Sequence, residues 1–329
     1  MSTGEHRSTP PHAAIVYHPG KAPVERIGSA VREQETSRSW RPSRWYETDP
    51  ADAGIAAVEQ ALRDGPAVVI VAGGDGTVRV ATEIMAGSGI PLALVPAGTG
   101  NLLARDLGVS LTDVEASVAA AFSGRERRID VGRVDLEEEG GARRSHAFVV
   151  MAGIGLDADM AAGTNAVAKR HLGWFAYVAP IARSVLANRL FHLHYRVNGG
   201  RRKSARAHTV IVGNCGTLAG NLLLLPHAVV DDGLLDVVMM RPKGRFGWAG
   251  IGSRLTAQGV ARTSRLTRRW MARAPELHAL AYAQGRRFEA RFDVPHLIQL
   301  DGDPFGQVVG VRIAVEPGAL RVAQPDALN

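Results

Sequence analysis

The fold is decided by the stretch Ala67-Val68-Val69-Ile70-Val71-Ala72-Gly73-Gly74-Asp75-Gly76-Thr77. Residues 67–71 form an apolar, β-branched run that is typical of a buried strand. After the glycines, small and apolar residues recur at helical spacing, namely Val78, Ala81, Thr82 and Met85. The stretch therefore predicts a strand, a glycine turn and a helix in direct succession.

The glycine turn has the composition of a phosphate-binding site. Glycine permits positive φ and lets a ligand approach the backbone closely. The start of a helix adds unpaired N–H groups and a partial positive charge. Asp75 would repel a bare phosphate, so either a cation such as Mg²⁺ bridges the two or the carboxylate polarises a hydroxyl. The plainer alternative is a tight turn in which Asp75 caps the helix.

A second glycine turn follows the same plan. Residues 92–95 read as a strand, Pro96-Ala97-Gly98-Thr99-Gly100-Asn101 as a turn, and residues 102–105 as the start of a helix. Turns that follow consecutive parallel strands lie side by side at the carboxyl edge of one sheet, where open α/β sheets bind ligands.

The pair of turns resembles one known family. GGDGT at 73–77 followed by PAGTGNLLAR at 96–105 is similar to the diacylglycerol kinase catalytic family, which includes bacterial lipid kinases and sphingosine kinases. The resemblance implies phosphorylation of a lipid hydroxyl by ATP with Mg²⁺. It also implies nucleotide-site roles for His18, Pro19, Gly20, Thr48, Gly73, Gly74, Asp75, Gly76, Thr77, Gly98, Thr99, Gly100, Asn101 and Asp130.

Residues 226–237 extend the resemblance with a segment that binds a structural Mg²⁺ in some bacterial members. The ligands carried over are the backbone carbonyls of Val229 and Leu234 and the carboxylate of Asp232. Oxygen ligands are those that Mg²⁺ prefers. The alternative is an ordinary strand turn with solvated acids.

Leu297-Ile298-Gln299-Leu300-Asp301-Gly302-Asp303 resembles the strand that ends in Asp-Gly-Glu in the family, where the last carboxylate is taken as the general base. That residue is Asp303 here, with Asp301 as the second candidate. The shorter side chain moves the carboxylate by about 1.5 Å, and a misplacement of about 1 Å can reduce the rate ~10²-fold. A simple turn between two strands fits poorly after such an apolar run.

The pattern of elements predicts an α/β protein of two domains. Residues 12–125 read as alternating strands and helices, that is, a parallel sheet covered by helices that binds ATP. Asp49–Pro50 and the Thr112/Glu115 pair are the expected starts of two of its helices. Residues 126–323 read as a β-rich, sandwich-like lipid domain with one helical stretch at about 158–190. The last residues are a candidate return to the first domain.

Composition and segment hydropathy indicate the cellular compartment of the protein. It has 329 residues and one cysteine, which excludes a disulfide framework and fits a reducing compartment. Residues 1–12 lack an apolar core of the kind that signal peptides carry. The longest uncharged run, 207–230, contains glycines, asparagines and a proline and is a poor membrane span. We expect a cytoplasmic protein that associates peripherally with membranes, and a homodimer is possible.

The positive charge is concentrated in one segment. Residues 241–291 hold twelve Arg or Lys and two acids, whereas the whole chain has a net charge of +7. Arg262, Arg265 and Arg269 would share one face of a helix. An anionic membrane surface is the expected partner, and a solvated helix face is the alternative. Nucleic-acid binding is disfavoured because the segment lacks interleaved surface aromatics and any recognised module.

The expected function is therefore an ATP-dependent lipid kinase, with diacylglycerol as the leading substrate and a sphingoid base or another lipid alcohol as alternatives. PAGTGNLLAR and the LDGD ending disfavour NAD kinase, which carries a turn similar to GGDGT. Three departures from the family suggest a non-catalytic binder as a rival: His18 for Asn, Val80 for Glu and Asp303 for Glu.

Overall fold

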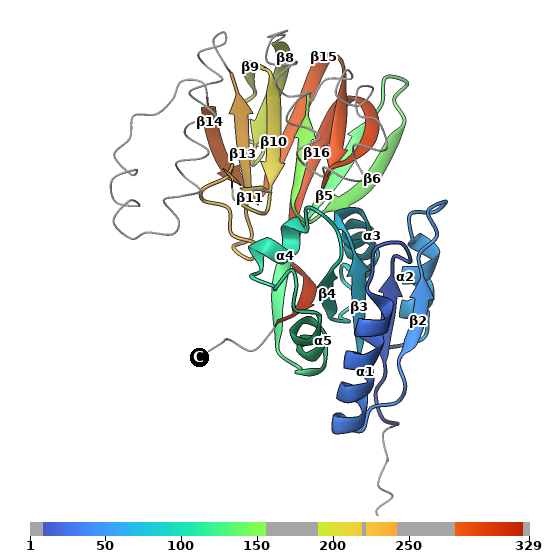
Figure 1. The fold of residues 1–329 in the computed structure, drawn as a ribbon. Coiled ribbons are helices and arrows are strands. Elements are labelled where there is room, and N and C mark those ends of the chain that lie inside the picture. Colours follow the sequence, from blue (N-terminus) through green and yellow to red (C-terminus); the bar gives the residue numbers. More distant parts are fainter. Residues whose placement is uncertain (1–8, 156–189, 219–221, 242–279, 325–329) are drawn as a thin grey trace, which may run out of the picture. The chain divides into compact units, whose positions relative to one another are not determined.

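The computed structural model describes residues 9–155, 190–218, 222–241 and 280–324. The chain divides into two compact units (Figure 1). Unit 1 comprises Met1–Ala97, Val109–Arg127 and Leu320–Asn329, and unit 2 comprises Gly98–Gly108 and Arg128–Ala319. The expected α/β class, with a β-rich second part, is confirmed.

Unit 1 is built on a parallel sheet whose strands run in the order β4-β3-β1-β2. The strands are β1 Ala13–Tyr17, β2 Arg44–Glu47, β3 Val68–Gly73 and β4 Leu92–Pro96. Every residue of β3 is buried, as its β-branched composition predicts for a central strand. The end of the chain returns to this sheet, because Val322 pairs in parallel with Leu92 of β4.

Helices cover both faces of this sheet (Figure 1). They are α1 Val24–Arg38, α2 Ile55–Arg63, α3 Asp75–Met85 and α5 Val114–Phe122. α1 and α5 contact each other and share a core with alternate residues of the strands, such as Ile15 and Ile70. The remaining strand residues, such as Val69 and Val71, are equally buried and face the layer of α2 and α3.

Two helix starts differ from the sequence expectation. α2 begins at Ile55 rather than after Pro50, because the carboxylate of Asp52 accepts the amides of Gly54 and Ala56 and holds residues 49–54 in a turn. α5 is capped by Asp113, whose carboxylate accepts the Ala116 amide at 2.8 Å.

Glu115 was expected to form a capping box with Thr112, but its carboxylate instead pairs with Arg26 of α1 at 2.5 Å. In both α2 and α5, the free amides of the first turn bond to an aspartate that lies closer to that turn than the expected capping residue.

In its described residues, unit 2 is an antiparallel β structure with one short helix, α4 Leu102–Asp106. The main strand order is β14-β13-β10-β7-β15-β16, with β5–β6 and β8–β9 attached to β16 and β15. The bounds are β5 Glu126–Glu137, β6 Arg143–Phe148, β7 Met151–Ile154, β8 Phe191–Val197, β9 Lys203–Ala207, β10 Thr209–Gly213, β11 Thr217–Leu218, β12 Leu222–Leu223, β13 Leu235–Met240, β14 Leu280–Gly285, β15 Arg287–Leu300 and β16 Asp303–Ala323.

The long strand β15 pairs first with β8 and then with β7 along its length. Its first half pairs with β8, from Phe288 opposite Val197 to Phe292 opposite Leu193. Its last residues, from Ile298 on, pair with β7. The register against β16 shifts between Arg291 and His296, so a bulge redirects the strand from one partner to the other. A continuous apolar core lies beneath these strands and includes Phe148, Leu193 and Phe288.

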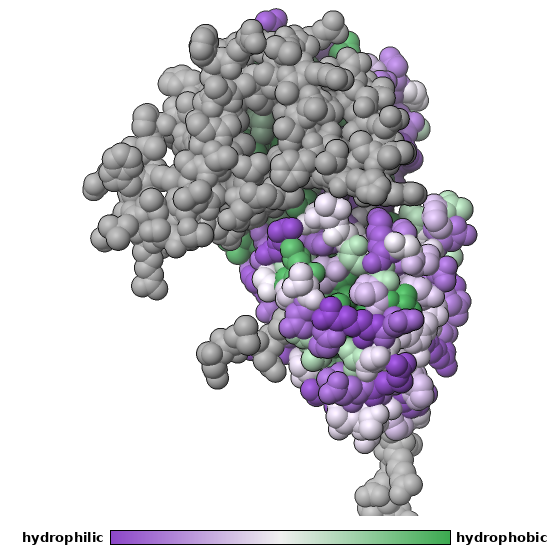
Figure 2. All heavy atoms as spheres, in the orientation of Figure 1, coloured by the Kyte–Doolittle hydropathy of each residue, from purple (hydrophilic) through white to green (hydrophobic). Residues whose placement is uncertain are grey.

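Two expectations lie outside the described residues. They are the helical stretch at about 158–190 and most of the basic segment, residues 242–279. Among the helices that the structure describes, none has the length and apolarity needed to cross a membrane. On the face of unit 1 seen in Figure 2, hydrophilic patches alternate with smaller apolar ones, as is usual for a water-exposed surface.

Candidate functional site

The carboxyl edge of the unit 1 sheet gathers the first group of predicted residues. His18, Thr48 and Gly73 stand at the ends of β1, β2 and β3. The His18 amide donates to the carbonyl of Ala72 at 2.9 Å, and the Thr48 amide donates to the carbonyl of Tyr17 at 2.9 Å. Three turns that are distant in sequence are thus brought to one edge, as the parallel strands predict.

The GGDGT stretch passes from strand to helix without an intervening loop. Gly73 ends β3, Gly74 is the extended N-cap residue with φ −94°, and Asp75 is the first residue of α3. Asp75 is therefore not the helix cap, which overturns the plainer interpretation of this stretch. None of its three glycines uses positive φ, so glycine is required here for another reason.

That reason is close approach. A Cβ at Gly73 would lie 2.7 Å from both Cβ and Oγ1 of Thr77, closer than real side chains come. The side chain of Thr77 thus folds back over the end of the strand. Gly74 offers no side-chain cap, and the first amides of a helix have no acceptor within it. An anion is the natural partner of such a helix start.

His18 keeps a hydrogen-bond donor at the position where the family has Asn. The Gly20 amide donates to Nδ1 of His18 at 3.1 Å. Burial and then the Lys21 charge lower the pKa of the imidazole, so the ring is neutral near pH 7. With Nδ1 accepting, the proton of the neutral ring sits on Nε2.

Arg79 was not predicted from the sequence. Its side chain is 9% exposed, and its guanidinium pairs with Glu83 of the same helix at 2.9 Å. This places a buried cation one turn beyond Asp75. The helix was predicted from small and apolar residues at helical spacing, so the charged Arg79 between them was not singled out. Val80, where the family has Glu, is a buried core residue.

The second glycine turn belongs to unit 2 and is held by its own asparagine. Asn101 has a left-handed backbone with φ 48°, and its side chain is bonded twice to Gly98. Oδ1 accepts the Gly98 amide at 2.9 Å, and Nδ2 donates to the Gly98 carbonyl at 2.7 Å. Arg105 adds a bond from Nε to the carbonyl of Gly100 at 2.7 Å. The shape of residues 98–101 therefore depends on Asn101, while Thr99 lies within the turn.

Asp130 joins three segments of unit 2. Its carboxylate accepts the amides of Gly233 and Gly318, each at 2.7 Å, and its own amide donates to the carbonyl of Val230 at 2.7 Å. Asp130 is 1% exposed. The structure thus gives this side chain a scaffolding role, and its contact with a nucleotide stays a prediction.

Asp301 is likewise engaged with the backbone. Oδ1 accepts the amides of Val150 and Met151, each at 2.8 Å, and Oδ2 accepts the amide of Val149 at 2.9 Å. These bonds fix the bend between β6 and β7. Asp301 and Gly302 also form the two-residue turn between β15 and β16, with φ of 49° and 90°. The segment is a hairpin turn after all, because positive φ at both positions suits a two-residue hairpin.

Asp303 differs from Asp301 in its surroundings. It opens β16 opposite Leu300, at the mouth of the hairpin. Its side chain is half-buried, whereas Asp301 is 5% exposed and has both oxygens occupied by amides. Of the two carboxylates, Asp303 is thus the better placed to exchange a proton with a substrate.

A buried asparagine that was not predicted from the sequence links Asp130 to the bend that Asp301 holds. Asn214 is 1% exposed, and its Nδ2 donates to the carbonyl of Asp130 at 2.8 Å. Its amide donates to the carbonyl of Val150, within the bend that Asp301 holds. The neighbouring Cys215 is buried, and burial raises the pKa of its thiol. A polar residue directly after the apolar strand β10 was the available signal.

The 229–234 segment has the donors that a hard cation requires. Asp232 Oδ1 accepts the Leu234 amide at 2.9 Å. Burial, followed by the nearby Asp130 and Asp231 charges, raises the pKa of Asp232. Asp232 is exposed, and a carboxylate that is crowded by other negative charges gains from a bound cation. With the carbonyls of Val229 and Leu234 in the same loop, the residues fit Mg²⁺, and occupation of the site stays a prediction.

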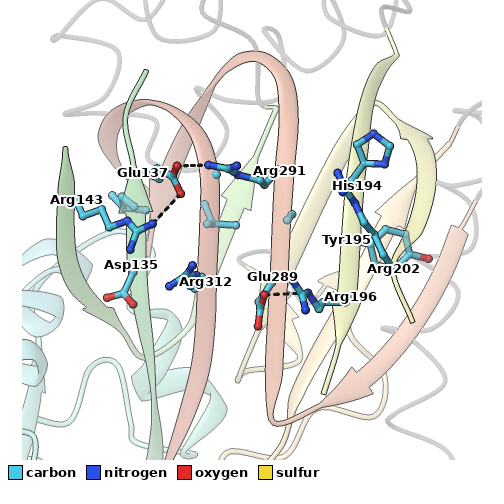
Figure 3. Close-up of a pocket in the computed structure, with 14 residues that line it drawn as sticks. Asp135, Glu137, Arg143, His194, Tyr195, Arg196, Arg202, Glu289, Arg291 and Arg312 are labelled. Atoms are coloured by element: carbon cyan, nitrogen blue, oxygen red, sulfur yellow. Dashed lines mark hydrogen bonds and ion pairs between the residues drawn. The ribbon is translucent and has the colours of Figure 1, made fainter. Parts of the chain in front are cut away.

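A separate concavity lies on the sheet of unit 2 (Figure 3). Its volume is about 330 Å³, and residues of β5, β8, β15 and β16 line it. Glu137 pairs with both Arg143 and Arg291, and Glu289 pairs with Arg196. The predicted site residues are all absent from its lining, so this charged hollow is distinct from them.

Comparison with known proteins agrees with this geometry. A model of the diacylglycerol kinase catalytic domain matches residues 13–134, and a model of the YegS C-terminal NAD kinase beta sandwich-like domain matches residues 149–324. A Pseudomonas aeruginosa protein described as a probable lipid kinase, YegS-like, is 32% identical over 94% of this chain and 93% of its own. A diacylglycerol kinase of Mycobacterium tuberculosis is 32% identical over 56% of this chain but only 58% of its own.

Solved structures share the fold. A diacylglycerol kinase from Bacillus anthracis has a TM-score of 0.71 and 18% identity over 98% of this chain and 99% of its own. Yeast NADH kinase has a TM-score of 0.52 and 9% identity over 96% of this chain and 83% of its own. On the two domain models and the near full-length relative, the chain belongs to the diacylglycerol kinase catalytic-domain family with a YegS-type C-terminal domain.

Proposed function

We propose that this protein is an ATP-dependent lipid kinase that transfers a phosphoryl group to the hydroxyl of diacylglycerol and forms phosphatidic acid. The observation that carries the proposal is the start of α3 at the carboxyl edge of a parallel sheet, where the N-cap residue Gly74 provides no side-chain cap. It occurs in a chain whose full-length relative is described as a probable lipid kinase.

Unit 1 supplies groups that suit the nucleotide. The first amides of α3 and its dipole favour phosphate oxygens. His18 adds a neutral ring with Nε2–H as donor, and Asp75 adds a carboxylate at the first helical position. When bound, Mg²⁺ would spread the negative charge that develops on the transferred group. Asp75 is the residue of this group that would hold the metal–phosphate network.

Unit 2 supplies the candidate base. The substrate hydroxyl oxygen forms a bond to the γ-phosphorus, the bond from that phosphorus to the β-phosphate oxygen breaks, and the hydroxyl proton passes to a carboxylate. We assign this role to Asp303, because the carboxylate of Asp301 is saturated with three backbone amides. Asp301 then acts as the residue that fixes the hairpin from which Asp303 projects.

Asp232 has a different task in this proposal. Together with the carbonyls of Val229 and Leu234 it would hold a structural Mg²⁺ in unit 2. Asp130 supports that loop through its bonds to Val230 and Gly233. The metal would stabilise the loop and take no part in the transfer itself.

The test is phosphate transfer from radiolabelled ATP to a panel of lipid alcohols in mixed micelles. The panel contains diacylglycerol, monoacylglycerol, ceramide and a sphingoid base, and the products are separated by thin-layer chromatography. We expect labelled phosphatidic acid to dominate. Label on the sphingoid base or another lipid alcohol would replace diacylglycerol as the substrate while leaving the kinase assignment intact.

Two variants of unit 1 complete the experiment. Asp75→Asn removes the charge but keeps the shape, and we expect turnover to fall at least about 100-fold. Glu59→Gln on α2 removes an exposed acid of the same unit and serves as the matched control. ATP binding without transfer to any lipid in the wild-type protein would make the chain a non-catalytic nucleotide binder.

A further inference from the structure

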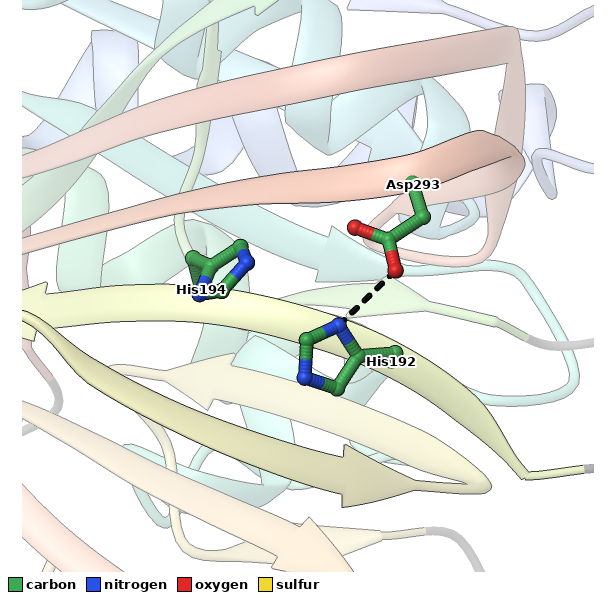
Figure 4. A group of neighbouring side chains, drawn as sticks. All are labelled: His192, His194 and Asp293. Carbon is green, nitrogen blue, oxygen red and sulfur yellow. Dashed lines mark hydrogen bonds and ion pairs between the residues drawn. The ribbon is translucent and has the colours of Figure 1, made fainter.

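Two histidines and an aspartate meet on the outer side of unit 2, apart from every residue assigned above (Figure 4). His192 and His194 lie two apart on β8 and therefore share one face of the strand. Asp293 lies on β15, the strand that pairs with β8. One potential ligand atom from each of the three side chains lies within 4.8 Å of the other two.

The contacts within this cluster are those of a partly assembled metal site. His192 Nδ1 lies 2.8 Å from Asp293 Oδ2, and the two imidazole rings meet edge to face with centroids 4.7 Å apart. The ring nitrogens of His194 have no hydrogen-bond partner among the described residues. A tetrahedral ion with bonds of about 2.0–2.1 Å needs ligand atoms about 3.3 Å apart. The longest separation must therefore shorten by at most about 1.5 Å, which rotation of the side chains can supply.

A neighbouring hydroxyl can determine which ring nitrogen of His192 carries the proton. Its Nε2 lies 2.5 Å from Oγ of Ser204 on β9. A hydroxyl can either donate or accept, so Ser204 can receive Nε2–H and leave the lone pair of Nδ1 for a metal. Hydrogen bonds to the second ring nitrogen are the usual way in which proteins orient histidine ligands.

We propose that His192, His194 and Asp293 form a binding site for Zn²⁺ or a similar divalent transition metal, which fastens β8 to β15. Two imidazoles and one carboxylate suit such ions, whereas Mg²⁺ prefers an all-oxygen set. Three protein ligands leave the fourth position of a tetrahedral ion to water. The single cysteine is buried elsewhere and offers no competing thiolate at the surface.

Nearby charges set the expected strength of binding. Arg206 stands opposite His192 in the β8–β9 register and is exposed, whereas Arg291 stands opposite His194 and is paired with Glu137. Arg206 is the cation that opposes a bound metal directly. We therefore expect Arg206→Gln to tighten metal binding. Added salt should also tighten it, because salt screens the repulsion between Arg206 and the metal.

The experiment measures Zn²⁺ binding to the full chain without a polyhistidine tag, by competition with a chromophoric chelator, in excess Mg²⁺. We expect one Zn²⁺ per chain that Mg²⁺ does not displace and that raises the midpoint of thermal unfolding. Co²⁺ in place of Zn²⁺ should give the visible absorption of a four-coordinate ion. Ser204→Ala should weaken binding about tenfold, and His194→Ala and Asp293→Asn should weaken it further.

Two controls separate this site from other metal binding. Arg196→Ala removes a side chain from the same face of β8 and should leave Zn²⁺ affinity unchanged. Asp232→Asn alters the predicted Mg²⁺ loop and should also leave it unchanged. Equal Zn²⁺ affinity in the wild-type protein, His194→Ala and Asp293→Asn, with all three folded by circular dichroism, would overturn the proposal. Because no step uses ATP or lipid, the result is independent of the kinase assignment.

Discussion

The carboxylate of Asp301 accepts the backbone amide of Met151 at 2.8 Å, across 150 residues of sequence. In return, the Asp301 amide donates to the Met151 carbonyl at 2.9 Å. The hairpin turn between β15 and β16 is thereby fastened to the start of β7. Asp301 is therefore a structural tie between this hairpin and β7, and its predicted catalytic role stays a prediction.

Asp301→Asn should therefore reduce stability. An amide side chain has one acceptor oxygen, so at least one of the three buried amides loses its partner. Leaving a buried donor unsatisfied costs about 1–3 kcal/mol. Urea unfolding followed by circular dichroism should show that loss. Asp303→Asn is the matched control, and we expect it to change the free energy of unfolding by no more than about 0.5 kcal/mol. Equal stability of both variants would contradict the structural role of Asp301.

Asp303→Ala should abolish phosphoryl transfer while ATP still binds. A positioned general base contributes about 10²–10⁴-fold to the rate. Single-turnover kinetics with diacylglycerol give the rate, and a fluorescent ATP analogue gives the binding. Asp303→Glu restores the residue found in the family and is expected to retain or raise the rate. If Asp303→Ala stayed active and a folded Asp301→Ala were inactive, the two roles would have to be exchanged.

The sequence predicted the elements whose signals are local. The apolar run before GGDGT and the helical spacing after it placed β3 and α3 correctly, and the apolar residues 92–95 likewise placed β4. The prediction that the start of α3 binds phosphate also rests on local composition. The need for glycine at position 73 cannot be predicted in this way. It arises because the Thr77 side chain occupies the space of a Cβ, and not from the φ angle.

The residues that were missed depend on partners far away in the chain. Asn214 bonds to Asp130 across 84 residues, so no window of sequence contains both. The turn at Asp301–Gly302 was judged improbable because an apolar run precedes it. That run is a buried strand that simply reverses into its neighbour, β16. The helix starts were displaced for a different, local reason, since several neighbouring side chains can accept the same free amides.

Asn101→Gly should weaken ATP binding without disturbing the fold. Glycine accepts the left-handed backbone of this position, so the variant removes the two bonds to Gly98 and keeps the backbone conformation. Each bond is worth about 0.5–1.5 kcal/mol, and we expect the KM for ATP to rise about tenfold. Steady-state kinetics at saturating lipid give the value.

Asn198→Gly is the matched control for that variant. Asn198 has φ 52° and accepts the amides of Arg286 and Arg287 through Oδ1, in a hairpin of the same unit. The same substitution there should leave the KM for ATP unchanged. A similar rise in both variants would mean that general loosening of unit 2, rather than the shape of residues 98–101, governs ATP binding.

Residues 241–291 are expected to dock the enzyme on an anionic membrane, since a lipid substrate must be reached from its bilayer. This segment holds twelve Arg or Lys and two acids, and Arg262, Arg265 and Arg269 have the spacing of one helical face. Each Lys or Arg near an anionic leaflet contributes about 1 kcal/mol, so replacing all three by Ala should weaken binding about 100-fold. The replacement of Arg201, Arg202 and Lys203, three exposed cations at a hairpin of unit 2, removes the same charge and serves as the control. Co-sedimentation with anionic and neutral vesicles, at low and high salt, measures the effect. We expect binding to anionic vesicles only, weakened by salt and by the first triple variant far more than by the second. Equal binding to both vesicle types, indifferent to salt, would leave the basic segment without this role.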